Sequence, residues 1–143
     1  MGKLKKQTTI NMSKTKIPMD VQNKVKIIIE DFNKKTFPKT PELFYYATFK
    51  GDFLYLNRNE GKMDSPIARL KYNGNFTDWG FAIFKWSSER YDPDEFMFPG
   101  VKYANGTIEG ALKAGHAAYP PTWAPSDSDL LSFFGHLFGN KKI

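Results

Sequence analysis

Residues 43–56, LFYYATFKGDFLYL, contain a hairpin turn between two runs of aromatic and aliphatic residues. The turn is Gly51-Asp52, which has glycine in the first central position, as a type II′ hairpin requires. It predicts that Leu43–Lys50 pairs with Phe53–Asn57 and that Lys50 lies opposite Phe53. Because side chains alternate along a strand, this register also predicts which residues share a face.

Both faces of this predicted hairpin are rich in apolar residues. One face, which we call face A, carries Leu43, Tyr45, Ala47, Phe49, Leu54 and Leu56. The opposite face, which we call face B, carries Phe44, Tyr46, Thr48, Lys50, Phe53 and Tyr55. A large apolar face is rarely left open in a monomer, so each face is expected either to be covered or to bind a partner.

A second hairpin signal follows in residues 67–86, IARLKYNGNFTDWGFAIFKW. Asn73-Gly74 is typical of a type I′ turn and predicts pairing of Ile67–Tyr72 with Asn75–Trp86, with Arg69 opposite Asp78. The predicted core face contains Ala68, Leu70, Tyr72, Thr77, Trp79, Phe81 and Ile83. The predicted continuation of face B contains Ile67, Arg69, Lys71, Phe76, Asp78, Ala82, Phe84 and Trp86. Face B therefore mixes aromatic side chains with cations.

Helix signals flank the two hairpins. Pro18 at the first position and basic residues at the end predict a helix over residues 18–35. Its apolar stripe consists of Val21, Val25, Ile28 and Phe32. Thr107 is placed as the N-cap of a second helix that ends near Tyr119. A short amphipathic helix is expected from about residue 127 to residue 138.

This order of elements predicts an α+β fold, with a four-stranded antiparallel sheet of two hairpins flanked by an N-terminal and a C-terminal helix, plus a short terminal helix. A chain of 143 residues suits a single domain. We expect a flexible Lys-rich arm at residues 1–16, an α+β domain at 17–119, and a Pro-rich spacer with the short helix at 120–143.

The net charge of +6 is concentrated near the N-terminus. Residues 1–40 contain ten lysines and three acidic residues, whereas residues 41–143 contain eleven basic and twelve acidic residues. The arm carries Lys3, Lys5, Lys6, Lys14 and Lys16. Such an arm is most often a solvated terminus, and the alternative is a contact with nucleic acid or another anionic surface.

Several classes of protein are disfavoured by composition. The chain has no cysteine, which excludes disulfides, thiolate catalysis and the common zinc frameworks. It has no apolar run that approaches the roughly 18 residues of a membrane span, and residues 1–16 lack the apolar segment of a secretory signal. We therefore expect a cytoplasmic protein with no membrane contact, no cofactor and no metal site.

Face B is the basis of the leading functional hypothesis, a non-catalytic binding protein that contacts nucleic acid. Aromatic and basic side chains on an open sheet face form a stacking platform for single-stranded nucleic acid. The predicted contact residues are Tyr46, Lys50, Phe53, Tyr55, Arg69, Lys71, Phe84 and Trp86, with Lys3, Lys5 and Lys6 of the arm. Two alternatives remain: a helix or loop covers face B, or face B binds another protein or a second copy of the chain.

A carboxylate group at Asp92, Asp94 and Glu95 is the basis of an enzyme alternative. With His116 as a base, these acids would provide general acid/base catalysis or hold a cation. The same residues are also ordinary turn formers, and His116 flanks the apolar stripe of its helix, where a structural histidine is expected. The chain has no phosphate-binding glycine loop and no nucleophile elbow, so no catalytic residue is assigned.

The last motif lies at residues 127–134, DSDLLSFF. It resembles the peptide through which proteins bind sliding clamps, in which one aliphatic and two aromatic residues form a hydrophobic plug. Leu130, Phe133 and Phe134 occupy those positions, whereas the glutamine that opens the motif is replaced by Asp127. The resemblance implies a protein partner, and the alternative is that this amphipathic helix packs on its own domain.

Overall fold

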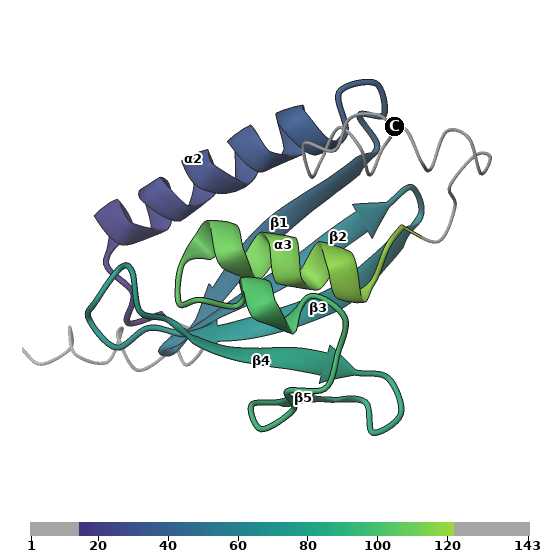
Figure 1. Cartoon of the computed structure of the whole chain (residues 1–143). Coiled ribbons are helices and arrows are strands. Elements are labelled where there is room, and N and C mark those ends of the chain that lie inside the picture. Colours follow the sequence, from purple (N-terminus) through teal and green to yellow (C-terminus); the bar gives the residue numbers. More distant parts are fainter. Residues whose placement is uncertain (1–14, 122–143) are drawn as a thin grey trace, which may run out of the picture.

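The computed structural model describes residues 15–121, which form a five-stranded antiparallel sheet with two α-helices on one face (Figure 1). The strands are β1 (Leu43–Lys50), β2 (Phe53–Glu60), β3 (Met63–Lys71), β4 (Gly80–Lys85) and β5 (Arg90–Asp92). The helices are α2 (Met19–Thr36), the short 3-10 helix η1 (Val101–Tyr103) and α3 (Ile108–Ala118). The strands lie side by side in chain order. The predicted α+β class with an antiparallel sheet is confirmed.

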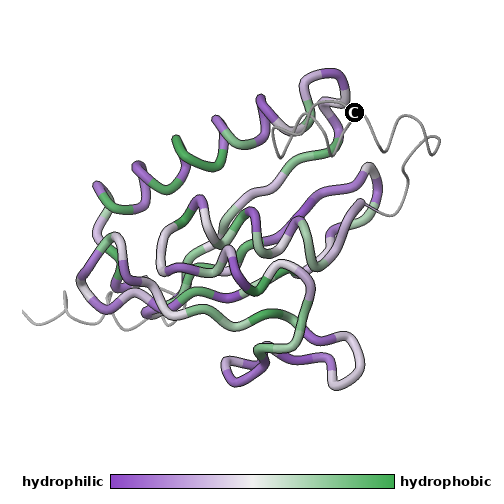
Figure 2. The backbone as a smooth tube through the Cα atoms, viewed as in Figure 1, coloured by the Kyte–Doolittle hydropathy of each residue, from purple (hydrophilic) through white to green (hydrophobic). Residues whose placement is uncertain are grey.

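Face A forms the core, because α2 contacts β1 and α3 contacts β3 from the same side of the sheet (Figure 1). The buried side chains include Val25, Ile29, Leu54, Leu56, Leu70 and Leu112. Figure 2 shows hydrophobic and hydrophilic residues alternating along α2, as expected for a helix with one face on a core. Neither helix between residues 15 and 121 combines the length and the apolar character that a membrane span requires.

The number of strands differs from the prediction of four. Strand β5 lies between the second predicted hairpin and the helix that begins after Thr107, where no strand is predicted, and it pairs with β4 through Tyr91 and Phe84. A strand of three residues is too short to show a recognisable alternation. Strands β2 and β3 are also longer than predicted, because they continue to a tight turn at Gly61, whose φ of 73° suits glycine.

The predicted turn at Asn73-Gly74 is wrong as the link between β3 and β4. Arg69 pairs with Ala82 rather than with Asp78, and residues 72–79 form a longer loop. In this loop Trp79 is buried and donates its indole N–H to the carbonyl of Phe76 at 2.8 Å. The partner of Arg69 changes from Asp78 to Ala82, which is a displacement by an even number of residues. Ala82 therefore keeps its predicted face.

Phe76 does not belong to face B, contrary to the prediction. Its ring packs against the core cluster and lies 6.2 Å from the ring of Trp79. Lys24 of α2 places its ammonium group 5.5 Å from the centre of the same ring. The loop therefore carries Phe76 to the helix side of the sheet.

Ile67 also changes sides relative to the prediction. The register between β2 and β3 shifts after Leu56, so Ile67 is an extra residue in β3, and it is only 1% exposed. Such a β-bulge turns a side chain to the opposite face. A Cβ atom at Gly115 of α3 would lie 2.4 Å from Cγ2 of Ile67, so α3 approaches the sheet where glycine leaves room.

The free edge of β1 is covered by polar contacts from the N-terminal part of the fold. Asn33 of α2 donates to the carbonyl of Tyr45 at 2.9 Å and accepts from its N–H at 2.8 Å. At the end of β1, the backbone N–H of Lys16 donates to the carbonyl of Gly51 at 2.8 Å. These bonds occupy groups that an exposed edge would offer to another chain.

Replacement of Gly115 by alanine is expected to destabilise the fold by about 1–3 kcal/mol, because the new methyl group would overlap Cγ2 of Ile67. Urea unfolding provides the measurement. In an Ile67→Ala background the same substitution is expected to be neutral or stabilising. The Cγ2 methyl group of residue 67 is then absent, and alanine favours a helix more than glycine does. An equal cost in both backgrounds would contradict the proposed contact.

Candidate functional site

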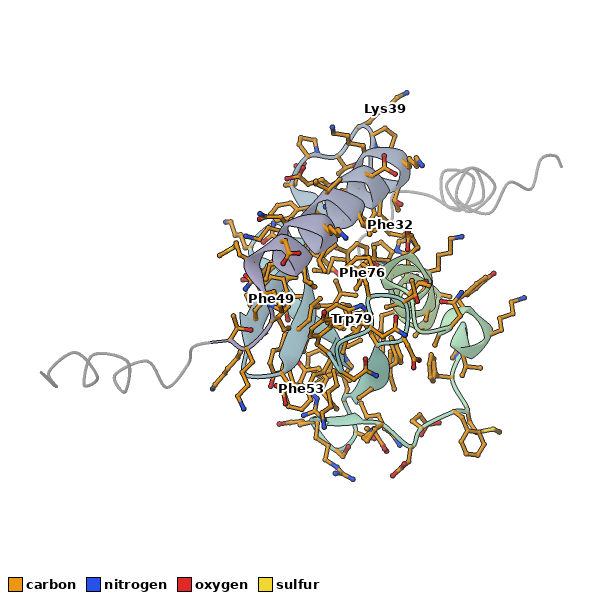
Figure 3. All side chains as sticks on the ribbon, turned by 90° about the vertical axis from the view of Figure 1, so that its left-hand side faces the viewer. Phe32, Lys39, Phe49, Phe53, Phe76 and Trp79 are labelled. Carbon is orange, nitrogen blue, oxygen red and sulfur yellow. The ribbon has the colours of Figure 1, made fainter. Side chains whose placement is uncertain are left out.

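Face B has no helix over it in residues 15–121, since both α2 and α3 lie on face A (Figure 1). In Figure 3, Phe53 lies on the side of the sheet away from α2, whereas Phe32 lies between α2 and the sheet. Trp86 is 54% exposed and Phe44 is 37% exposed. The other rings of face B are partly exposed, so the described fold leaves an aromatic surface in contact with solvent.

Five rings of face B form a continuous series of contacts, which we call the aromatic ladder. Its members are Phe53, Tyr55, Tyr91, Phe84 and Trp86. Successive ring centres in that order are 6.2, 5.5, 5.1 and 5.0 Å apart, with tilted or edge-to-face geometry. Edge-to-face pairs of this kind are favourable and hold the rings in defined orientations.

Arg69 lies within the aromatic ladder. Its guanidinium carbon is 4.4 Å from the centre of the Phe53 ring and 5.5 Å from that of Tyr91. It pairs across the sheet with Tyr55 on one side and with Ala82 on the other. The small side chain of Ala82 leaves space for rings of β2 and β5 to meet across β3 and β4.

Two lysines flank the Phe53 end of the aromatic ladder. The register places Lys50 of β1 and Lys71 of β3 on either side of Phe53. In the part of the chain that the structure describes, the ion pairs are Lys35–Asp31, Arg58–Glu60 and those of Lys85, so Lys50, Arg69 and Lys71 have no carboxylate partner there. Positive charge is therefore available at this end of face B.

The Lys-rich arm joins the fold next to the same lysines. Thr15 donates its hydroxyl proton to the carbonyl of Gly51 at 3.0 Å and forms a β-bridge with this residue. Gly51 directly follows Lys50, so the chain enters the domain beside the basic end of face B. Residues 1–14, which include Lys3, Lys5 and Lys6, lie outside the described residues.

Tyr46, the remaining predicted contact residue of the sheet, lies on β1 away from the aromatic ladder. Its ring centre is 6.0 Å from that of Phe44, and its hydroxyl group donates to the Asp64 carboxylate at 2.9 Å. Burial and this hydrogen bond raise the pKa of Tyr46. Face B thus has a basic end at Lys50 and an acidic group at Asp64 toward the opposite end of β1.

The predicted carboxylate group of Asp92, Asp94 and Glu95 lies next to Lys85, which contacts two of the three acids. The Lys85 ammonium group lies 2.8 Å from Oε1 of Glu95 and 3.7 Å from Oδ2 of Asp92. The hydrogen bond from Lys85 lowers the pKa of Glu95. Asp92 also accepts from the backbone N–H of exposed Asp94, as in an ordinary Asx turn. No group of three acidic or histidine side chains within residues 15–121 converges in a manner that would hold a metal ion.

His116 lies in the core rather than at an accessible site. It is fully buried, and its Nδ1 atom is 2.7 Å from the hydroxyl oxygen of Tyr45. Arg58 donates to that same oxygen at 2.9 Å, which leaves the tyrosine proton for His116. Burial, together with the nearby Arg58 charge, lowers the pKa of His116 to about 3. Burial raises the pKa of Tyr45 to about 12. A neutral histidine without solvent contact suits a structural role.

A small cleft of about 190 Å³ adjoins the Trp86 end of the aromatic ladder. Its lining includes the exposed side chains of Met63 and Trp86 and the polar residues Asp64 and Ser65. Tyr119 also lines it and donates its hydroxyl proton to the carbonyl of Phe84. The cleft extends the exposed surface around Trp86.

No family model, curated protein or solved structure matches the chain.

Most of the predicted face B residues meet on one surface, because the hairpin register of β1 and β2 is as predicted. The sequence does not identify Tyr91, which joins the aromatic ladder through β5. Its only signal is an aromatic residue within an aromatic loop. The plug residues Leu130, Phe133 and Phe134 lie outside the described residues.

Proposed function

We propose that this protein is a non-catalytic binding protein that contacts nucleic acid through face B and the Lys-rich arm. The observation that carries the proposal is the aromatic ladder with Arg69 inside it and Lys50 and Lys71 at its end. Stacking on aromatic rings and neutralisation of phosphates are together sufficient to bind nucleic acid.

The charge distribution supports an anionic ligand. Lys85 of β4 has two carboxylate neighbours, whereas Arg69 and the lysines beside Phe53 have none among residues 15–121. An arginine stacked on a ring keeps its N–H groups directed outward at the edge of its plane, where they can donate to phosphate oxygens. Lys16, the last lysine of the arm, bonds through its backbone to Gly51 beside Lys50, and the sequence of the arm contains four further lysines.

Trp86→Ala is expected to weaken binding of a labelled oligonucleotide by about 5- to 100-fold, because one base would lose its stacking partner. Fluorescence anisotropy at low and at physiological salt provides the measurement, with the full-length protein. Phe96→Ala is the matched control, since Phe96 is a 69% exposed aromatic residue outside the aromatic ladder, and it is expected to change affinity less than twofold. An equal loss in both variants would contradict a role for face B.

Self-association or a protein partner at face B is the second candidate. The exposed rings of Phe44 and Trp86 favour it, because exposed apolar patches often mark protein interfaces. Sedimentation of the full-length protein distinguishes the two candidates. A dimer that Trp86→Ala dissociates and that salt does not affect would favour this candidate over nucleic acid.

A further inference from the structure

The two ends of face B differ in chemistry. Lys50, Phe53 and Lys71 form one cross-strand row, and Arg69 lies in the next row. The rings at the other end, from Tyr91 through Phe84 to Trp86, continue without a further cation stacked on them among the described residues. Phosphate-binding groups and open ring surface are therefore separated along the face.

Two surfaces on face B are suited to stacking. Arg69 covers the Phe53 ring at 4.4 Å, so a base at this end would stack on the guanidinium plane, as single-stranded bases do in other complexes. At the other end the indole of Trp86 is 54% exposed. The three rings between them are only partly exposed and contact one another edge to face or at a tilt, so they serve mainly to hold these two surfaces in place.

These features select a single strand over a duplex. A duplex presents phosphates and base edges on its outside and hides the base faces in a stack with a rise of about 3.4 Å. Only bases that have left the stack expose a face to Trp86 or to Arg69.

We infer that the ligand is single-stranded nucleic acid, with one unpaired base stacked on the Arg69 guanidinium group that covers Phe53, another on Trp86, and the phosphates of the strand held by Lys50 and Lys71. This inference rests on the proposed function and specifies its ligand.

The test compares four probes of equal length, about 12 nucleotides, against the full-length protein. They are single-stranded DNA, single-stranded RNA, a DNA duplex, and a DNA backbone of abasic sites, which keeps the phosphates and removes the bases. Fluorescence anisotropy at low salt is expected to show at least about tenfold tighter binding of one of the two single strands than of the duplex and the abasic strand. Binding of either single strand that is tighter than binding of both the duplex and the abasic strand supports the inference.

Two substitutions separate stacking from charge. Arg69→Lys keeps the charge and loses the plane, so it is expected to weaken single-strand binding by about 5-fold or more and to leave abasic binding unchanged. Lys71→Gln is expected to weaken all probes and to reduce the slope of log affinity against log salt by about 0.7. Lys113→Gln is the matched control, because Lys113 is an exposed lysine on α3. It is expected to change neither the affinity for the probes nor the slope against salt.

The outcomes distinguish the two levels of the proposal. Duplex or abasic probes that bind as tightly as the single strands would overturn the single-strand inference and leave nucleic-acid binding in place. Failure of all four probes to bind at low salt would overturn the proposed function itself.

Discussion

Arg58→Leu is expected to destabilise the fold by about 3–5 kcal/mol, because it removes the cation from a buried charged network. The side chains of Arg58 and Glu60 are both 2% exposed. The guanidinium Nε and Nη2 atoms each lie 2.5 Å from Oε2 of Glu60. A buried carboxylate that loses its compensating cation is costly, since it has also lost its hydration.

Arg58 also connects the sheet to the end of α3. Its Nη1 atom donates to the hydroxyl oxygen of Tyr45 at 2.9 Å and to the carbonyl of Tyr119 at 2.5 Å. The latter bond satisfies a carbonyl just past the last turn of α3. Leucine at position 58 would remove these bonds together with the ion pair, which is why the expected cost is larger than that of a single hydrogen bond.

Urea unfolding followed by tryptophan fluorescence measures this cost. Arg90→Leu is the matched control, because Arg90 is exposed on β5, and it is expected to change the free energy of unfolding by less than about 0.5 kcal/mol. Arg58→Leu/Glu60→Leu is expected to recover part of the loss, since it removes both buried charges. A cost below about 1 kcal/mol for Arg58→Leu alone would show that the network does not stabilise the fold.

The free energy of unfolding is expected to fall as the pH decreases from 6.5 toward 3, by up to roughly 3–5 kcal/mol through His116 alone. The pKa of His116 is lowered from 6.5 to about 3 in the folded protein. Between these two pH values the unfolded chain binds a proton at this residue and the folded chain does not. The stability contributed by neutral His116 is therefore complete above pH 6.5 and is lost as the pH falls toward 3.

The surroundings of His116 explain why the folded protein excludes this proton. The imidazole is packed among the rings of Phe32, Phe37 and Tyr45, at centre-to-centre distances of 6.1, 5.7 and 5.9 Å. The positive charge of Arg58 also disfavours an imidazolium ion there. Protonation would further break the hydrogen bond that Nδ1 accepts from Tyr45.

Comparison with His116→Gln isolates this effect from the titration of carboxylates. Glutamine retains an acceptor for the Tyr45 hydroxyl group and does not titrate. Urea unfolding at a series of pH values gives the free energy of unfolding against pH. Between pH 6.5 and 4 the slope of this plot is expected to be smaller in the variant than in the unsubstituted protein. The same slope in both proteins would show that His116 does not control the pH dependence.

The parts of the fold that were predicted correctly depend on local chemistry. Strand β1 and its register with β2 follow from the Gly51-Asp52 turn and the alternation of side chains, and the structure pairs Lys50 with Phe53 as predicted. The bounds of α2 and α3 agree with the predictions to within one or two residues, since capping and apolar periodicity are set within each helix. Phe53 and Tyr55 are assigned to one face for the same reason, whereas Arg69 is assigned to it through the Asn73-Gly74 turn and keeps this face because its partner changes by an even number of residues.

The parts that were wrong depend on contacts between distant segments. Ile67 enters the core because a bulge in β3 meets Gly115, which is far along the chain. In the loop at residues 72–79, Trp79 donates its backbone N–H to the carbonyl of Gly106 at 2.8 Å rather than to a neighbouring strand. Tyr91 reaches Tyr55 only after β5 has joined the sheet. A single sequence carries little signal for any of these contacts.

Alternation and turn chemistry in the sequence alone determined which side chains of β1 and β2 share a face, because both properties act between neighbouring residues. They do not determine which face is covered, since both faces are apolar. The tertiary structure decided that question by placing α2 and α3 on face A, where Asn33 bonds to the edge of β1 and Gly115 fits against Ile67. It also joined rings of β2 and β5 with those of Phe84 on β4 and Trp86 just after it into the aromatic ladder, because only the completed sheet brings them within contact distance.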